Sequence, residues 1–340
     1  MSARPLSYAE AIREALSQMM ERDPSVFIIG QGVWSPWYVG TTMQDLDKRF
    51  GRERVIDSPV SENATTGVAI GAALAGLRPV VIHPRVDFMV LAVDQLVNEA
   101  ANWCYMFGGR SPVPMVIRPI INRGGEQGAQ HSQALHAWFM HVPGLKVVMP
   151  ATAYDAKGLL VASILDDNPV LYIDDRWLYA ETSDVPEEIY AVPIGQAAVL
   201  REGSDATVVA VSYMVKEALA AAEELSRDGI EVEVIDVRTL KPLDDATILT
   251  SVNKTGRLVV ADGGWRTCGA AAEIVARVCE AAFASLRAPV ARVTLPDLPA
   301  PTSPALEGAY YARAAHVSAA VCAVLGERAP AALSEVRGSR

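Results

Sequence analysis

Short runs of aliphatic and β-branched residues alternate with helical segments along most of the chain, and this alternation constrains the fold more than any other feature. In the first half, strands are predicted at 26–30, 54–57, 79–83, 114–120, 145–149 and 169–173. An amphipathic helix opens the chain, and further helices are predicted at 61–75, 88–105, 133–139 and 153–165. Strands that alternate with helices in this way predict a mostly parallel sheet covered on both faces.

Residues 175–205 interrupt this rhythm with two prolines, an acidic stretch and turn residues. The alternation then resumes, with strands predicted at 206–212, 232–237, 258–261 and 290–295 and helices at 214–227, 244–252, 270–283 and 312–325. A chain of 340 residues can support two domains, each with its own core. The predicted fold class is α/β, with two consecutive parallel-sheet domains at 1–180 and 206–328, a linker at 181–205 and a flexible tail at 329–340.

The composition excludes several classes of function. A net charge of −10 argues against a nucleic-acid or membrane-surface role, because both need concentrated lysine and arginine. The four cysteines match neither a zinc pattern nor a disulfide framework. The N-terminus lacks an apolar signal core, and no apolar run approaches the roughly 20 residues needed to span a bilayer. We therefore expect a soluble protein in the cytoplasm.

The stretch 57–79 places a carboxyl group at a predicted ligand-binding edge. Glu62 falls in the first turn of a predicted helix that follows a strand, and open parallel sheets bind ligands at the carboxyl ends of their strands. Gly67, Gly71 and Ala75 follow at intervals of four, which leaves a helix face without bulk that another backbone can approach. Two alternatives remain open, because an acid in a first turn complements the helix dipole and small residues serve ordinary helix packing.

The spacing Glu-x4-Gly-Val-x-x-Gly from Glu62 to Gly71 resembles the signature of the pyrimidine-binding domain of thiamine-diphosphate enzymes. The segments SPVSENATTGVAIGAALAGLRPVV, DFMVLAVDQLVNEAA, GAQHSQALHAWFMHVPGLKVVMPATAYDAKGLL and IDVRTLKPLD are similar to the β-subunit of the decarboxylating component of 2-oxo acid dehydrogenases, of the pyruvate and branched-chain type. The resemblance runs from about Ser7 to Leu325. It implies a pyrimidine-binding domain followed by a transketolase C-terminal-like domain.

The resemblance implies roles for three side chains. Glu62 would hydrogen-bond the aminopyrimidine ring nitrogen of thiamine diphosphate, a task suited to a carboxyl group in a dry cleft. Phe88 would stack on the aminopyrimidine ring, although a lone phenylalanine is more often a core residue. His131, at the end of the glycine-rich loop 122–131, would bind the substrate carboxylate or carry protons. A histidine that caps the helix beginning near Ser132 explains the same position equally well.

The segment 162–169 resembles the helix-end turn that holds a structural potassium ion in this family. Carbonyl groups at a helix C-terminus carry partial negative charge, so a cation site is physically reasonable there. By position in the resemblance, its ligands would be the main-chain carbonyls of Met115, Ser163, Ile164, Asp166 and Asn168. An ordinary helix stop before Pro169 accounts for the same residues.

One family motif is absent. The Gly-Asp-Gly segment with a later asparagine, through which thiamine enzymes hold the diphosphate and Mg²⁺, has no match; Asp262-Gly263-Gly264 lacks the first glycine and lies in the second predicted domain. The resemblance therefore implies that an α-subunit supplies Mg²⁺ and the diphosphate half of the site in an α2β2 assembly. His83-Pro84-Arg85 also departs from the family, where apolar residues commonly precede the stacking aromatic.

The sequence thus predicts the β-subunit of a thiamine-diphosphate enzyme that decarboxylates a small 2-oxo acid and passes the acyl carbanion equivalent to a lipoyl domain. A lipoyl acyltransferase core is a further expected partner. The alternative is a two-component carboligase of transketolase type, which delivers the same unit to an aldehyde. A nicotinamide-binding oxidoreductase is disfavoured because Gly30-Gln31-Gly32 is followed by Ser35 instead of glycine. A non-catalytic scaffold would leave Glu62 and His131 without a role.

Overall fold

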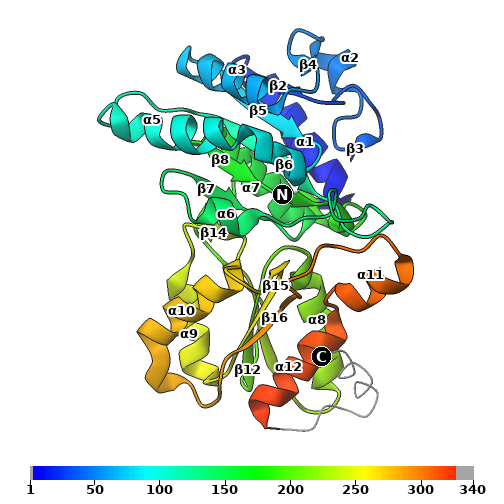
Figure 1. Cartoon of the computed structure of the whole chain (residues 1–340), viewed down its shortest axis with the longest axis vertical. Helices are drawn as coiled ribbons and strands as arrows, with labels where there is room; N and C mark the ends of the chain where they lie inside the picture. Colours follow the sequence, from blue (N-terminus) through cyan, green and yellow to red (C-terminus); the bar gives the residue numbers. More distant parts are fainter. Residues whose placement is uncertain (1–2, 327–340) are drawn as a thin grey trace. The chain divides into compact units, whose positions relative to one another are not determined.

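The computed structural model describes residues 3–326, which form two compact units (Figure 1). The first unit contains the described residues up to Arg123 together with Gln130–Ile194 and Leu240–Pro242. The second contains Gly124–Ala129, Gly195–Thr239 and the described residues from Leu243 onward. The predicted tail, 329–340, lies outside the described residues. Each unit is built on a sheet of its own, so the prediction of an α/β fold with two parallel sheets is confirmed.

The first unit is organised around an eight-stranded sheet with the order β14-β7-β8-β6-β5-β2-β4, and β9 pairs with β6 off this path. Pairings among β2, β4, β5, β6, β7, β8 and β9 are parallel. The strands are β2 (Val26–Gly30), β4 (Val55–Asp57), β5 (Arg78–His83), β6 (Val116–Ile121), β7 (Lys146–Val148), β8 (Val170–Tyr172), β9 (Asp174–Asp175) and β14 (Thr239–Lys241). A separate antiparallel ribbon pairs β1 (Ala3–Ser7) with β10 (Thr182–Pro186), and β3 spans Tyr38–Thr41.

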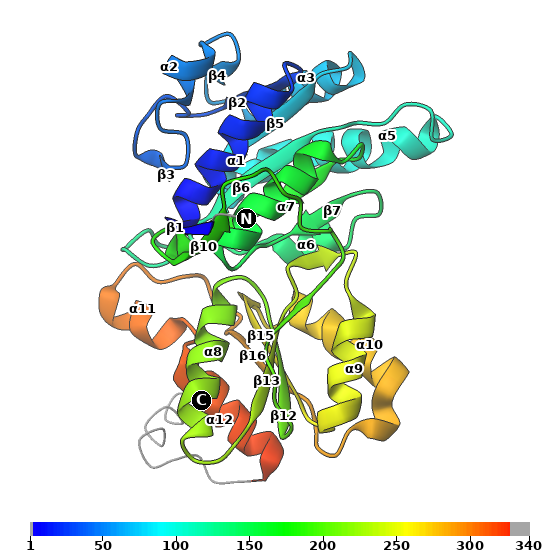
Figure 2. The ribbon, with the colours of Figure 1, turned by 180° about the vertical axis from the view of Figure 1, so that it is seen from behind.

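Helices cover both faces of this sheet. Helix α1 (Tyr8–Arg22) packs against α7 (Ala153–Leu165) on one face, and α3 (Glu62–Leu74) lies on the other with α5 (Ala101–Met106) (Figure 2). Helix α1 begins with a capping box, in which Ser7 and Glu10 satisfy each other's backbone N–H groups. All six residues of β6 are buried, as expected for a strand covered on both sides. Helices α2 (Leu46–Phe50) and α6 (His136–Met140) are short.

The helix predicted at 88–105 is a composite. It consists of α4 (Val86–Met89), a 3₁₀ turn (Val90–Ala92), a π-helical segment (Gln95–Ala100) and α5. Hydrophobic periodicity signals helical structure without distinguishing its winding, so the sequence did not reveal the change of pitch. π-helical turns are rare and frequent at functional sites.

The second unit contains a five-stranded sheet with the order β11-β13-β12-β15-β16. The pairings are parallel except for the antiparallel edge strand β11. The strands are β11 (Ala198–Arg201), β12 (Ala206–Ala210), β13 (Val232–Asp236), β15 (Leu258–Trp265) and β16 (Ala291–Leu295). Helices α8 (Tyr213–Ser226) and α12 (Ala314–Leu325) lie on one face, and α9 (Asp245–Thr255) and α10 (Ala270–Ala282) on the other (Figures 1 and 2). Helix α11 spans Pro304–Tyr310.

The segment predicted as a linker, 181–205, holds two strands, β10 and β11, one in each unit. Among the described helices, none combines the length and apolarity that a membrane span requires.

Candidate active site

The carboxyl edge of the first sheet carries Glu62. Strand β4 ends at Asp57, a four-residue turn follows, and Glu62 is the first residue of α3. The residue is only 3% exposed. Carboxylates are rarely buried unless they have a partner, whereas an acid that merely complements the helix dipole can do so while facing water. Burial therefore favours a functional role for Glu62 over a capping role.

Phe88 and His131 meet at the same edge. Phe88 lies in α4, directly after β5, and His131 lies in the segment that follows β6. Their ring centroids are 5.1 Å apart with an interplanar angle of 89°, an edge-to-face contact. Both side chains are half-buried. The structure thus brings together two of the three side chains singled out in the sequence, and α4 also packs against α3, which carries the third.

Asp87 adds a carboxyl group that sequence reasoning missed. It is 7% exposed, and its Oδ1 accepts the backbone N–H of Gln133 at 3.1 Å. Burial raises the pKa of this carboxyl, against the opposing effects of that hydrogen bond and of His131. Among the described residues, Oδ2 of Asp87 and the hydroxyl of the buried Ser132 have no hydrogen-bond partner. Buried polar atoms are normally satisfied, so these two indicate a place for a ligand or water.

A buried histidine lies at the end of β5. His83 is 1% exposed and its Nε2 is 3.2 Å from the hydroxyl of Thr66, which is fully buried in α3 one turn after Glu62. Burial lowers the pKa of His83 to about 4, so the ring is neutral at physiological pH. The sequence singled out His83 as a departure from the family pattern, but gave no sign of its partner.

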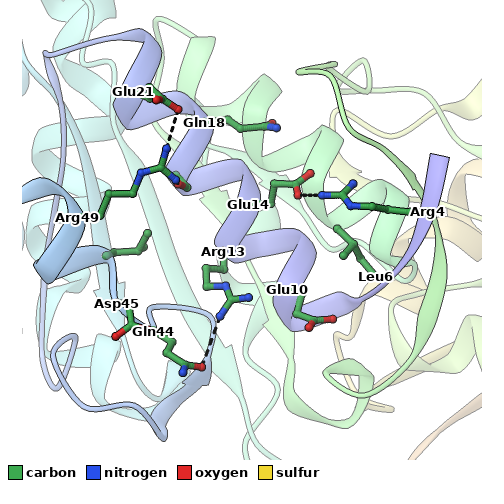
Figure 3. A pocket seen from close by; sticks show the side chains of 12 residues that line it. Arg4, Leu6, Glu10, Arg13, Glu14, Gln18, Glu21, Gln44, Asp45 and Arg49 are labelled. Atoms are coloured by element: carbon green, nitrogen blue, oxygen red, sulfur yellow. Dashed lines mark hydrogen bonds and ion pairs between the residues drawn. The ribbon is translucent and has the colours of Figure 1, made fainter. Parts of the chain in front are cut away.

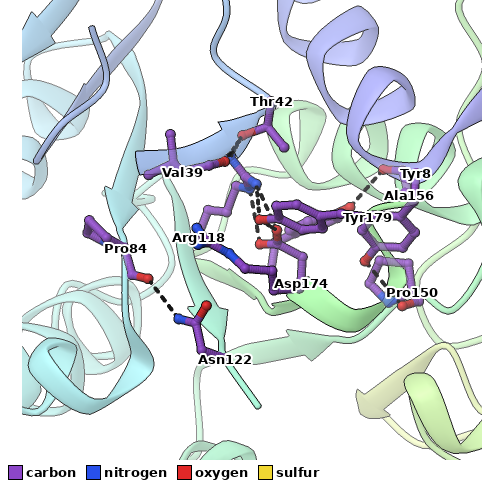
Figure 4. A network of polar contacts seen from close by, with 12 residues as sticks. Tyr8, Val39, Thr42, Pro84, Arg118, Asn122, Pro150, Ala156, Asp174 and Tyr179 are labelled. Atoms are coloured by element: carbon purple, nitrogen blue, oxygen red, sulfur yellow. Dashed lines mark hydrogen bonds and ion pairs between the residues drawn. The ribbon is translucent and has the colours of Figure 1, made fainter. Parts of the chain in front are cut away.

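The turn after His83 is held by hydrogen bonds to one carbonyl. The carbonyl of Pro84 accepts from Nη1 of Arg85 at 2.8 Å. It also accepts from the amide of Asn122, directly after β6, at 3.5 Å (Figure 4). These contacts fix the backbone between β5 and the helix that carries Phe88.

Beneath this edge lies a buried ion pair (Figure 4). Arg118 in β6 donates to both carboxylate oxygens of Asp174 in β9, at 3.1 and 2.7 Å, and both residues are fully buried. Arg118 also donates to the hydroxyls of Thr42 and Tyr179. Burial opposes the charge on the guanidinium, but Asp174 and Tyr179 hold the pKa of Arg118 above its ordinary value. The network is satisfied by its own members, so we assign it to stabilising the sheet.

The glycine-rich loop uses left-handed backbone, as its composition suggested. Gly124, Gly125 and Gly128 have φ values of 63°, 64° and 72°, and Glu126 has 61°. Residues Gly124–Ala129 belong to the second unit, where the N–H of Gly124 donates to the hydroxyl of Tyr311 at 3.1 Å. His131 belongs to the first unit.

Two carbonyls of the expected potassium site accept hydrogen bonds from an arginine. Nη1 of Arg78 lies 3.0 Å from the carbonyl of Ile164 and 3.1 Å from that of Asp166, while the carbonyl of Met115 accepts the N–H of Val170. Each carbonyl oxygen has two lone pairs, so one remains on each of the three for an ion. Arg78 nevertheless adds a positive charge at the end of α7.

The described residues contain no group of three or more histidine, cysteine or acidic side chains placed to hold a metal ion. Asp262, in the segment that most nearly matches the Mg²⁺ motif, is fully buried in the second unit. Its Oδ1 accepts the N–H of Gly264 at 3.0 Å, and its Oδ2 lies 3.4 Å from the N–H of Ala271 in the first turn of α10. Asp262 therefore serves the local backbone.

A groove of about 590 Å³ lies elsewhere in the first unit, along α1 and α2 (Figure 3). Two of its arginines are paired, Arg4 with Glu14 and Arg49 with Glu21, and Arg13 is 3.5 Å from the amide oxygen of Gln44. The groove mixes opposite charges and contains none of the residues assembled at the sheet edge.

Comparison with known proteins places the chain in a family. Residues 4–181 match the model of the transketolase pyrimidine-binding domain, and residues 195–317 match that of the transketolase C-terminal domain. A solved chain described as a split-gene transketolase, inactive beta4 tetramer, shares the fold with a TM-score of 0.78 and 24% identity, covering 95% of this chain and 99% of that one. The fold and the two matching domain models define a member of the transketolase-like superfamily, whose enzymes depend on thiamine diphosphate.

Curated relatives narrow this class. The chain is 44% identical to the acetoin:2,6-dichlorophenolindophenol oxidoreductase subunit beta of Cupriavidus necator, over 94% of this chain and 97% of that protein. It is 45% identical to the pyruvate dehydrogenase E1 component subunit beta of Rickettsia felis, over 89% and 93% respectively. The chain belongs to this family of dehydrogenase β-subunits, as the sequence predicted, and subunits of this kind work with an α-subunit.

Proposed function

We propose that this chain supplies the pyrimidine-binding half of a thiamine-diphosphate site that decarboxylates a 2-oxo acid and passes the acyl unit to a lipoyl domain. The observation that supports the proposal most strongly is the burial of Glu62 in the first turn of α3, at 3% exposure, beside the elements that carry Phe88 and His131. A doubly wound sheet binds its ligands at this carboxyl edge. The residues present fit the aminopyrimidine, which needs one carboxyl group and one flat apolar face.

Thiamine diphosphate, when bound, supplies the acidic ring carbon and the electron sink that decarboxylation requires. Glu62 hydrogen-bonds the pyrimidine ring nitrogen and shares a proton with it, a task for which a buried carboxyl group is suited. Phe88 offers a ring face for the flat heterocycle. The edge-to-face contact with Phe88 restricts rotation of the His131 imidazole. In this orientation a ring nitrogen of His131 is available to hydrogen-bond the substrate carboxylate or to transfer a proton.

The α-subunit contributes the remaining half, including Mg²⁺ bound to the diphosphate, in an α2β2 assembly. Two features of this chain support an α-subunit partner: the sequence has no Gly-Asp-Gly segment, and one face of α3 carries small residues that are exposed. Gly67, Val68 and Gly71 are exposed there, Val68 by 61%. A Cβ atom at Gly71 would meet nothing within 4 Å in the described chain. We propose that a backbone segment of the partner packs on this face.

A potassium ion at the end of α7 is part of the proposal. Its ligands would be the main-chain carbonyls of Met115, Ser163, Ile164, Asp166 and Asn168, and the ion would stabilise the last turn of the helix. Titrating K⁺ into the protein in a sodium buffer should raise the melting temperature, and choline should not. Identical melting curves in both salts would remove the ion from the proposal.

A second candidate is cleavage of a 2-hydroxyketone such as acetoin. The favouring observation is that the relatives named for acetoin, from Cupriavidus necator and Bacillus subtilis, align over 94% and 96% of this chain at 44% and 41% identity. Transfer to an aldehyde is not favoured, because the named relatives are dehydrogenase subunits.

The test is reconstitution with the cognate α-subunit. Turnover of pyruvate, branched-chain 2-oxo acids and acetoin should be measured with a lipoyl domain and with 2,6-dichlorophenolindophenol as acceptors. We expect turnover of a 2-oxo acid that depends on added thiamine diphosphate and that falls about 100-fold or more in Glu62→Gln. Glu273→Gln, an exposed acid in the first turn of α10, is the matched control. Activity that is unchanged in Glu62→Gln would refute the assignment, and turnover of acetoin alone would select the second candidate.

A further inference from the structure

The strongest unexplained feature of the first unit is a buried polar contact between the two elements that carry the proposed cofactor ligands. His83 closes β5, five residues before Phe88, and Thr66 lies in α3, four residues after Glu62. Their side chains are 1% and 0% exposed, and Nε2 of His83 is 3.2 Å from Oγ1 of Thr66. This contact lies outside every role assigned above.

The contact restrains two elements relative to each other. Four residues make about one turn of an α-helix, so Thr66 lies on the same side of α3 as Glu62 and directly behind it. The His83 backbone leads within three residues into α4, and the carbonyl of the intervening Pro84 is held by Arg85 and Asn122. The hydrogen bond therefore joins α3, one turn after Glu62, to the segment that leads into the helix of Phe88.

Burial makes this contact expensive to lose. A buried imidazole or hydroxyl group without a hydrogen-bond partner destabilises the fold by its desolvation free energy, whereas the hydrogen bond in the intact pair offsets that penalty. Burial also keeps the His83 ring neutral, so one ring nitrogen carries a proton and the other does not. A neutral imidazole can hold the hydroxyl of Thr66 without placing a positive charge behind Glu62.

We propose that His83 is a positioning residue: through its hydrogen bond to Thr66 it fixes the first turn of α3 against the β5–α4 turn, and so sets Glu62 and Phe88 for the aminopyrimidine. This inference rests on the proposed function for the identity of the ligand. It assigns His83 no contact with the substrate or the cofactor.

The first test uses the chain alone and needs no activity. Hydrogen exchange of the backbone amides of Thr65 and Thr66, the first with acceptors one turn earlier in α3, should be faster in His83→Phe and in Thr66→Val than in the natural protein. His83→Gln should restore slow exchange, because the glutamine amide can replace Nε2 as a hydrogen-bonding group. Thr207→Val is the matched control, because Thr207 is a buried threonine in the second unit that bonds Ser251 and Thr255 at 2.7 and 2.8 Å. Unchanged exchange in both site variants would overturn the proposal.

The second test measures cofactor affinity in the reconstituted heteromer by titration calorimetry. His83→Phe and Thr66→Val should each weaken thiamine diphosphate about five- to tenfold, the effect expected for one buried hydrogen bond. The double variant should be no weaker than either single variant, because both remove the same contact. Thr207→Val should leave the affinity unchanged. Effects that add in the double variant, or that Thr207→Val reproduces, would contradict a positioning role.

Turnover of Glu62→Gln in the reconstituted heteromer, measured beside these tests, separates this inference from the proposed function. If Glu62→Gln leaves turnover intact, the proposed function fails. If Glu62→Gln reduces turnover as expected while His83→Phe changes neither exchange nor affinity, only the positioning role fails.

Discussion

The two units present acidic side chains at comparable places and use them differently. In the second unit, Asp262 in β15 directs its oxygens at the backbone N–H groups of Gly264 and Ala271. In the first unit, Glu62 is buried at the head of α3, and Asp87 directs one oxygen at Gln133 and leaves the other without a partner among the described residues. Asp262 thus has both carboxylate oxygens directed at its local backbone. Asp87 retains one acceptor oxygen that a ligand or a water molecule can use.

Neutralising one acid in each unit is the most direct test of this difference between the two units. Glu62→Gln should reduce turnover by a factor of about 100 or more, as expected for the loss of a group that acts in proton transfer, and leave the melting temperature nearly unchanged. Asp262→Asn should lower the free energy of unfolding by about 1–2 kcal/mol, because amide nitrogen cannot accept the N–H bonds, and leave turnover per folded site intact. Activity assays and thermal melts of both variants decide. The reverse pattern would show that the two edges have been assigned the wrong way round.

Lowering the pH should reduce the free energy of unfolding of the first unit, because His83 is buried in its neutral form. The unfolded chain takes up a proton on this histidine below pH 6.5, whereas in the folded chain the pKa is about 4. Between pH 4 and pH 6.5 the unfolded state therefore binds more protons than the folded state. The contribution of the neutral His83 to the free energy of unfolding is complete above pH 6.5. It is lost as the pH falls to 4, by about 3 kcal/mol in total. Denaturant titrations across this range measure the loss. His83→Phe should flatten the profile, and an unaltered profile would contradict the assignment.

The exposed face of α3 predicts that added bulk there reduces the affinity for the α-subunit without changing the stability of the isolated chain. Gly71→Leu adds bulk where the described chain has open space, so the isolated chain should keep its melting temperature, while its affinity for the α-subunit should fall about tenfold or more, because the added side chain prevents close backbone approach. Analytical ultracentrifugation of the mixed subunits provides the measurement. Leu306→Ala, at an exposed leucine of α11, serves as a control. Full assembly of the Gly71→Leu chain would remove this face from the interface.

The smallest expected effect concerns Asp87. Burial raises the pKa of its carboxyl, so the ionised form destabilises the fold at neutral pH. Asp87→Asn should therefore make the chain slightly more stable at pH 7 while lowering turnover, the trade expected where a site keeps an unfavourable charge for function. A variant that is both less stable and fully active would show that Asp87 is a structural cap for Gln133.

The sequence predicted the alternating architecture because parallel strands buried on both faces are continuous apolar runs, and β6, with six buried residues, is such a strand. Spacing and family resemblance also led to Glu62, Phe88 and His131 as candidate site residues, and their roles stay predictions. The contacts of Thr66 and Asp87 could not be read in the same way. Each contact depends on which side chains from separate elements lie close together in the folded chain. No local sequence pattern predicts the partner of a threonine within a helix or of the acid before Phe88.

The potassium ligands show a similar limit. A helix-end turn can be recognised from 162–169, but the hydrogen bonds from Arg78 to Ile164 and Asp166 join residues more than eighty positions apart. Long-range pairing of this kind is set by the register of β5 and β6 and by the length of α7, which local sequence does not specify.

The four-residue turn between β4 and α3 determines the direction in which the helix points the Glu62 carboxyl group. Each residue of an α-helix advances the side-chain direction by about 100°. One residue inserted between Asp57 and Glu62 would either lengthen the turn or rotate the whole helix, and rotation would carry Glu62 away from the sheet edge and Gly71 away from its exposed face together. Indels in this turn should therefore be far more damaging than indels at Gly76, beyond the end of the helix, where no such phase is transmitted.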